Sequence, residues 1–136
     1  MERKLIEGAT MAYNLPIGCT IQEFCSPQHI AVHAIKGHMI AASAEASFMP
    51  DQSWFINRVV VLPARAPRGT GLGSELVRHL LACIVDADRV AGRATRVVVT
   101  PGGYGADPEK QFNFYLKAGF TRSAEPELLE WKGIAA

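Results

Sequence analysis

The stretch that decides the fold is Trp54–Ile84, WFINRVVVLPARAPRGTGLGSELVRHLLACI. Its first part, Phe55–Leu62, is rich in β-branched and aromatic residues and is followed by Pro63, which predicts a buried strand. Its last part has apolar residues three and four positions apart, the spacing of an amphipathic helix, at Leu72, Leu76, Leu80, Cys83 and Ile84. The stretch therefore predicts a strand, a glycine-rich turn and a helix in succession.

The turn, Arg68-Gly69-Thr70-Gly71-Leu72-Gly73, has glycines at alternate positions where the helix begins. The first amides of a helix have no partner within the helix and lie at the positive end of its dipole. Such a turn can therefore bind an anion, and a pyrophosphate best. The Arg68 guanidinium could clamp phosphate oxygens with two hydrogen bonds. A Walker loop is excluded because no GK pair ends the turn, and the spacing GxGxG differs from the GxGxxG of dinucleotide-binding folds.

A second motif lies near the C-terminus, at Phe114–Phe120, FYLKAGF. It closes a predicted helix over Glu109–Ala118. Asp107 and Pro108 are suitable residues for the start of that helix, and Gly119 is a suitable residue just after its end. By itself the motif could be an ordinary amphipathic helix end, so its meaning depends on the first motif.

Taken together, the two motifs resemble the GCN5-related N-acetyltransferase (GNAT) family. Arg68, Gly71 and Gly73 occupy the defined positions of its acyl-CoA signature R/Q-x-x-G-x-G/A, and FYLKAGF closely matches its C-terminal helix motif. The resemblance covers roughly Trp54–Phe120. It implies an α/β (α+β) fold with one mixed, mostly antiparallel twisted sheet flanked by helices, in a single domain over residues 1–136. Few residues precede His29, so we expect the family's N-terminal helical region to be reduced.

The resemblance also implies an activity: transfer of the acetyl group of acetyl-CoA to an amine by direct attack on the thioester, with no metal. In the family, the backbone of the strand before the turn binds the pantetheine arm, and one of its N–H groups stabilises the oxyanion. The corresponding residues here are Val59, Val60 and Val61. The turn would hold the pyrophosphate through Arg68, Gly69, Thr70, Gly71, Leu72 and Gly73. The tyrosine of the second motif, Tyr115, would donate a proton or a hydrogen bond to the departing thiolate.

The general base that the attacking ammonium requires is less evident. The predicted central strand offers Asn57, which could hold a water molecule. On the preceding strand Glu45 is the best carboxylate candidate, with Glu23 behind it. An exposed structural role for Glu45 is the alternative.

The rest of the chain predicts further strands around this centre. Alternating and continuous apolar runs predict strands over 20–24, 29–36, 39–48, 96–100, 120–122 and 128–131, with a hairpin turn at Gly37. Residues 1–18 show no convincing period, and no strand is predicted there. The element order is that of an α+β or mixed α/β sheet.

Composition narrows the class of protein. With 136 residues, a net charge of +1 and 49% hydrophobic residues, the sequence resembles an ordinary globular protein, and no nucleic acid is expected as a partner. No apolar run is long enough to span a bilayer, and the first residues lack a secretory signal, so we expect a cytoplasmic protein. Three cysteines match no zinc spacing, and His29, His33 and His38 are interpreted as solvent-facing rather than metal-binding.

The acceptor remains open between an amine-bearing small molecule and a protein amine, and a homodimer could complete an open acceptor site. Two other functions are also left open. One is a catalytically silent acyl-CoA sensor or scaffold of the same fold, favoured by the missing base on the central strand. The other is an acetylating toxin directed at tRNA, which would require a basic acceptor face that a charge of +1 does not indicate.

Overall fold

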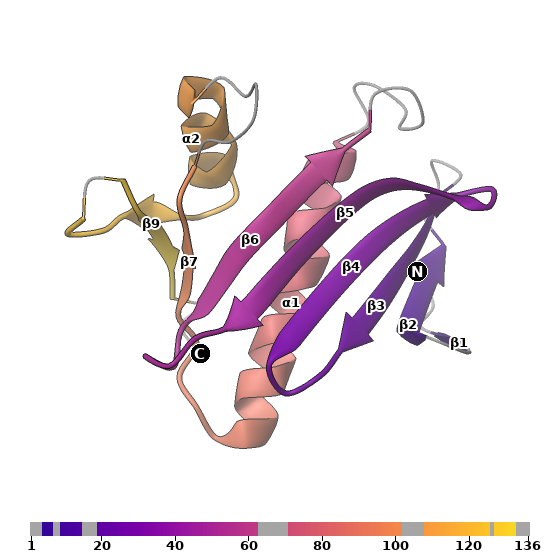
Figure 1. Ribbon diagram of the computed structural model, residues 1–136, viewed down its shortest axis with the longest axis horizontal. Coiled ribbons are helices and arrows are strands. Elements are labelled where there is room, and N and C mark those ends of the chain that lie inside the picture. The colour runs from indigo at the N-terminus through magenta and orange to yellow at the C-terminus, as the bar shows by residue number, and fades with distance from the viewer. Residues whose placement is uncertain are drawn as a thin grey trace.

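A computed structural model describes residues 4–6, 9–14, 19–62, 71–101, 108–125 and 127–132. These residues form one twisted sheet of nine strands in the order β1-β2-β3-β4-β5-β6-β7-β9-β8. All neighbouring strands run antiparallel except β6 and β7, which are parallel. The expected mixed, mostly antiparallel sheet flanked by helices is confirmed (Figure 1).

The strands are β1 (Lys4–Ile6), β2 (Ala9–Asn14), β3 (Thr20–Cys25), β4 (His29–Lys36), β5 (Met39–Phe48), β6 (Trp54–Val61), β7 (Val97–Val99), β8 (Thr121–Arg122) and β9 (Leu129–Trp131). The described helices are α1 (Leu72–Ala91) and α2 (Pro108–Lys117). From β3 onward each element lies where the sequence predicted it, within one or two residues at its ends. None of the described helices is long and apolar enough to cross a membrane.

The first two strands are a correction, because no strand was predicted before Thr20. Residues Ala9–Asn14 form β2, which pairs with β3 from Met11 to Asn14, for instance Ala12 opposite Gln22. The segment ATMAYN has too few β-branched residues to show a strand period, so its conformation depends on the hydrogen bonds that β3 offers. Within residues 4–6, 9–14 and 19–62 all regular structure is strand.

The core lies between α1 and one face of the sheet. Along β3 to β6 alternate residues face α1, among them Ile21, Val32, Ala44 and Ile56, all fully or almost fully buried. The residues of β5 on this face are small alanines, which allow α1 to lie close to the centre of the sheet (Figure 1). The opposite face of β3 to β6 is not covered by either described helix.

A buried polar network connects the end of α1 to β6. The Asp88 Oδ1 carboxylate oxygen accepts hydrogen bonds from the Trp54 indole N–H, at 3.1 Å, and from Arg93 Nε, at 3.0 Å. Asp88 and Trp54 are almost completely buried, and the Arg93 guanidinium also stacks on the Phe48 ring, 4.1 Å from its centroid. Removal of the carboxylate would leave a buried indole N–H and a guanidinium without their acceptor.

We therefore expect the substitution Asp88→Ala to lower the free energy of unfolding by about 3 kcal/mol, the cost of breaking a buried ion pair. Urea denaturation monitored by tryptophan fluorescence would measure it. Asp86→Ala is the matched control, because Asp86 forms an exposed ion pair with Arg89 two residues away on the same helix and should cost well below ~1 kcal/mol. Equal losses in the two variants would contradict a structural role for the buried network.

Candidate functional site

The site predicted from the sequence centres on the place where β6 and β7 part. The two strands pair only at Trp54 and Phe55, opposite Val97 and Val98. Beyond Phe55, β6 continues to Val61 paired with β5 on one side, while no described strand pairs with its other side. Figure 1 shows the strands diverging towards the end at which α1 begins and α2 lies. Val59, Val60 and Val61 all lie on this unpaired part of β6.

The backbone directions of these valines differ. Leu62 N–H donates to the Ala41 carbonyl of β5 at 2.9 Å. Because successive residues of an antiparallel strand alternate between facing the partner and facing away, Val60 directs its backbone groups to β5 as Leu62 does. Val59 and Val61 then direct theirs to the open edge. Of the three predicted residues, Val59 and Val61 can bind a ligand through their backbone there, and Val60 cannot.

The divergence coincides with a bulge in β6. Glu45 of β5 is opposite Arg58, and the next residue of β5, Ala46, is opposite Ile56, so Asn57 is an extra residue in the ladder. A bulge bends its strand and increases the local twist, which turns the end of β6 away from β7. Asn57 is exposed, and its side-chain amide donates to Ser47 Oγ at 2.8 Å.

Helix α1 begins beside the end of β6. Its N-cap is Gly71 in the left-handed conformation, with φ of 70°, and no side chain caps the first-turn amides. A Cβ built on Gly73 would lie 3.5 Å from Val61 and 3.6 Å from the Phe114 ring, so β6, α1 and α2 converge at this glycine. Arg68, Gly69 and Thr70 lie outside the described residues. The Leu72 side chain is buried in the core, and only its backbone could serve a ligand.

Tyr115 lies on α2 behind this convergence. It is 4% exposed, and its ring makes edge contacts with Phe114 and Phe120, at centroid distances of 5.1 and 5.3 Å. Burial raises the pKa of its phenol to about 12, so the hydroxyl remains protonated at neutral pH and can act as a hydrogen-bond donor.

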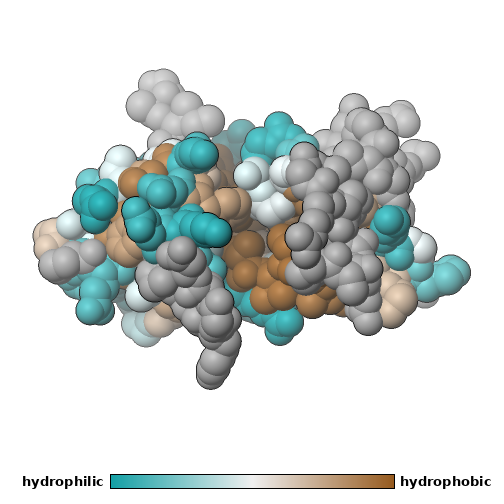
Figure 2. Space-filling model, turned by 90° about the horizontal axis from the view of Figure 1, so that it is seen from above, coloured by the Kyte–Doolittle hydropathy of each residue, from teal (hydrophilic) through white to brown (hydrophobic). Residues whose placement is uncertain are grey.

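Viewed from above, the surface of the molecule is hollowed at its centre, and the hollow is lined mainly by hydrophobic residues (Figure 2).

This arrangement of strands and helices is shared with proteins of known structure. No protein-family model and no curated protein matches the sequence. Solved structures do match, among them an acetyltransferase candidate of the GNAT family from Desulfovibrio desulfuricans. The likeness has a TM-score of 0.59 at 20% identity and covers 77% of this chain and 69% of that one. The chain has the GNAT fold. The resemblance noted in the sequence is thus confirmed at the level of the fold.

Two further structures with this fold are informative. A Bacillus subtilis acetyltransferase in complex with CoA matches with a TM-score of 0.56 at 17% identity, over 79% of this chain and 78% of that one. The AtaT–AtaR complex bound to DNA matches with a TM-score of 0.60 at 18% identity, over 76% of this chain and 66% of its matched chain. The chain therefore spans about two thirds of the length of two of the three structures. At these identities the likeness shows the GNAT fold and not the substrate or partner.

A cavity of about 640 Å³ lies between α1, the end of α2 and β9. Its floor is apolar, with Val77, Leu81 and Trp131, and its rim carries Arg78 and Lys117. The Arg78 guanidinium forms a two-pronged ion pair with Glu75, one turn earlier on α1. No motif in the sequence indicates this cavity. Arg78 follows the glycine turn closely and Lys117 is part of FYLKAGF, but nothing in the sequence shows that α1 and α2 are adjacent.

The predicted base candidates fall on both faces of the sheet. Glu45 is half-buried on the face of β5 turned away from α1, next to the bulge of β6. Glu23 is a correction, because it lies on the opposite face, 1% exposed, with its carboxylate 3.4 Å from His79 Nδ1 on α1. The sheet therefore separates Glu23 from Glu45, and Glu23 belongs to the core. The described residues hold no group of three potential metal ligands.

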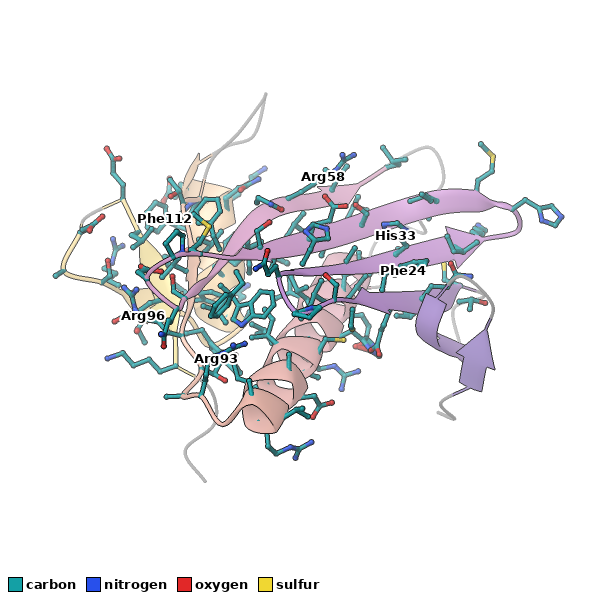
Figure 3. All side chains as sticks on the ribbon, turned by 60° about the horizontal axis from the view of Figure 1, so that its bottom comes forward. Phe24, His33, Arg58, Arg93, Arg96 and Phe112 are labelled. Carbon is teal, nitrogen blue, oxygen red and sulfur yellow. The ribbon has the colours of Figure 1, made fainter. Side chains whose placement is uncertain are left out.

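The face of β3 to β6 opposite α1, the open face, also carries a histidine that no sequence motif marks as functional. His33 of β4 and Arg58 of β6 project from the face opposite α1 (Figure 3). The pKa of His33 lies below its ordinary value of 6.5, mainly because the ring is partly buried. The Glu45 carboxylate raises this pKa, and the positive charge of Arg58 lowers it further. The His33 ring is therefore neutral at pH 7. It also contacts the Phe24 ring, at a centroid distance of 5.2 Å.

An NMR titration of the His33 ring would test this electrostatic coupling without any ligand. Glu45→Gln removes the influence that raises the pKa, so the pKa of His33 should fall further. Arg58→Gln removes an influence that lowers it, so the pKa should move back towards 6.5. Asp86→Asn, on α1, is the control and should leave the His33 titration unchanged. Identical titrations in wild type and both open-face variants would show that the three side chains are not coupled.

Proposed function

We propose that the protein transfers the acetyl group of acetyl-CoA to an amine acceptor. The observation that carries this proposal is the parting of β6 from β7 directly beside the uncapped start of α1. An open strand edge and a free helix N-terminus are the two features that an extended, phosphate-bearing thioester requires. The GNAT fold, found also in an acetyltransferase solved with CoA, supports the same assignment.

The described residues fit this co-substrate. The pyrophosphate would lie against the first amides of α1 at Gly71, Leu72 and Gly73, which no side chain caps. Arg68, Gly69 and Thr70 would complete that contact from the preceding turn. The pantetheine arm would pair with the backbone of Val59 and Val61 as an added strand. A Cβ at Gly73 would be in ordinary contact with Val61 and Phe114, so the glycine leaves a small space between them.

The chemistry would then need no covalent intermediate on the protein. The amine attacks the thioester carbonyl, and an N–H of the open β6 edge stabilises the developing oxyanion. Tyr115 would donate a hydrogen bond to the departing thiolate. With the phenol pKa at about 12 and a reference thiol pKa of about 8.5, full proton transfer costs roughly 5 kcal/mol, so Tyr115 acts as a hydrogen-bond donor rather than as an acid.

The proton of the acceptor's ammonium group would be removed by residues on the open face of the sheet. Glu45 lies beside the bulge, on the neighbouring strand and directly opposite Arg58. Asn57 could hold a water molecule beside Glu45, through which the proton taken up by Glu45 reaches solvent. These two residues are proposed as the base and its water-holding partner.

Calorimetric titration with acetyl-CoA, followed by an assay of CoA thiol release in the presence of amines, would test the function. Micromolar binding together with amine-dependent thiol release would support it. An absence of acetyl-CoA binding would refute it. Binding without release for any amine would favour the acyl-CoA sensor, for which the absence of a carboxylate or imidazole between Phe55 and Val61 is the supporting observation.

A further inference from the structure

Three polar side chains cluster on the open face beside the bulge. Glu45 of β5 is directly opposite Arg58 of β6, and both act electrostatically on the His33 ring of β4. Glu45 and His33 are half-buried, while Arg58 is exposed. Two half-buried aromatic residues, Phe24 and Phe55, lie on the same face. The cluster thus combines an acid, a cation and a neutral imidazole next to apolar rings.

The charged groups of Glu45 and Arg58 are not paired with another side chain in the described structure. Residues directly opposite on antiparallel strands have Cβ atoms about 5 Å apart, so Glu45 and Arg58 could pair. Yet neither side chain forms a hydrogen bond or an ion pair with any other described residue. Ion pairs of this kind do form in other parts of the described structure, for instance between Asp88 and Arg93 and between Glu130 and Arg96. Two opposite charges that lie near each other without forming an ion pair are suited to bind a ligand that carries both charges.

The position of the cluster connects it to the proposed reaction. Arg58 immediately precedes Val59, whose backbone faces the open edge where the thioester would lie. Glu45 is on the neighbouring strand, about 5 Å further from that edge. A molecule held by both side chains would therefore lie next to the thioester carbonyl, on the face of the sheet opposite α1 (Figure 3).

We propose that this cluster is the acceptor site and that the acceptor is an α-amino acid, with its ammonium group on Glu45 and its carboxylate on Arg58. The proposal rests on the acetyl transfer proposed above. A guanidinium binds a carboxylate with two parallel hydrogen bonds, and a carboxylate is the natural acceptor for an ammonium. Phe24 and Phe55 provide apolar surface for the side chain of the amino acid.

The reaction balances with these groups. The ammonium passes one proton to Glu45, from which it reaches solvent. The free amine forms the bond to the carbonyl carbon as the carbon–sulfur bond breaks, and the second proton of the nitrogen ends on the CoA thiolate. The products are the N-acetyl amino acid, CoA thiol and one proton.

The experiment measures CoA thiol release from acetyl-CoA with each of the twenty common L-amino acids and, for every one accepted, with its carboxamide. The wild-type protein should prefer the acid to the amide. Arg58→Gln should lower kcat/KM for the amino acid about tenfold or more, the loss of a charge-assisted contact, and should leave kcat/KM for the amide unchanged. Arg89→Gln, which removes an exposed arginine from the far end of α1, is the matched control and should change neither.

The outcomes separate the two proposals. Calorimetry with acetyl-CoA should give the same affinity for wild type, Arg58→Gln and Arg89→Gln. If the wild type binds acetyl-CoA but acetylates no amino acid, or acetylates acid and amide equally well, the acceptor assignment is overturned and the acetyltransferase assignment stands. If the wild type does not bind acetyl-CoA, the proposed function itself fails.

Discussion

The substitution Gly71→Val should weaken acetyl-CoA binding by about two orders of magnitude or more while the protein remains folded. Gly71 is the N-cap of α1 in the left-handed conformation, and a Cβ there would meet nothing within 4 Å. A valine side chain would thus clash with no described part of the protein but would occupy the space in front of the first-turn amides. Loss of two or more charge-assisted hydrogen bonds to phosphate accounts for a decrease of that size.

The control for this substitution is Gly92→Val, at the other end of the same helix. Gly92 is also left-handed, with φ of 73°, and also has open space around its Cβ position. Both variants should lose roughly 1–2 kcal/mol of stability, because a side chain is strained in that conformation. Only Gly71→Val should lose acetyl-CoA binding in a calorimetric titration. Equal affinity in the two variants would show that the start of α1 does not bind the phosphates.

The substitution Tyr115→Phe should lower kcat for acetyl transfer about a hundredfold and leave acetyl-CoA affinity within about twofold of wild type. The change removes one hydroxyl and keeps the ring, which packs against Phe114 and Phe120. In this variant the backbone of β6 and α1 still binds acetyl-CoA in the ground state. Only stabilisation of the departing thiolate is lost, so the effect should appear in kcat.

The pH dependence provides a second measurement of the same residue. The folded-state pKa of Tyr115, about 12, lies above its ordinary value of 10. The phenol is therefore fully protonated at pH 7 to 9, and no loss of rate in that range should come from Tyr115. The associated contribution to stability is present below pH 10 and is lost as the pH rises from about 10 to 12. A Tyr115→Phe variant with wild-type kcat would remove the residue from the mechanism.

Parts of this structure could be predicted because their signals are local. The β-branched run of β6, the three-and-four spacing of α1 and the glycine at its N-cap depend on neighbours in the chain, and these described parts lie where the sequence predicted them. The predicted helix before Gly119 is found as α2, with Tyr115 buried on it. The resemblance of the two motifs to the GNAT family was sufficient to predict the fold.

Other parts depend on pairing between distant residues. Strand β2 exists because β3 offers a hydrogen-bonding edge, and β1 pairs in turn with β2. The bulge at Asn57 depends on the register between β5 and β6, and it determines which valines face the open edge. The same register places Glu45 opposite Arg58, and the alternation of β3 turns Glu23 into the core beside His79.

The sequence by itself determined the type and order of most elements, the glycine turn and the aromatic end of α2, because these follow from propensity and periodicity over a few residues. Only the tertiary structure decided which faces of the sheet the polar residues occupy, that Val59 and Val61 rather than Val60 face the gap, and that His33, Glu45 and Arg58 meet. The physical reason is that a strand has a period of two, so a shift of one residue in its register moves every side chain to the other face.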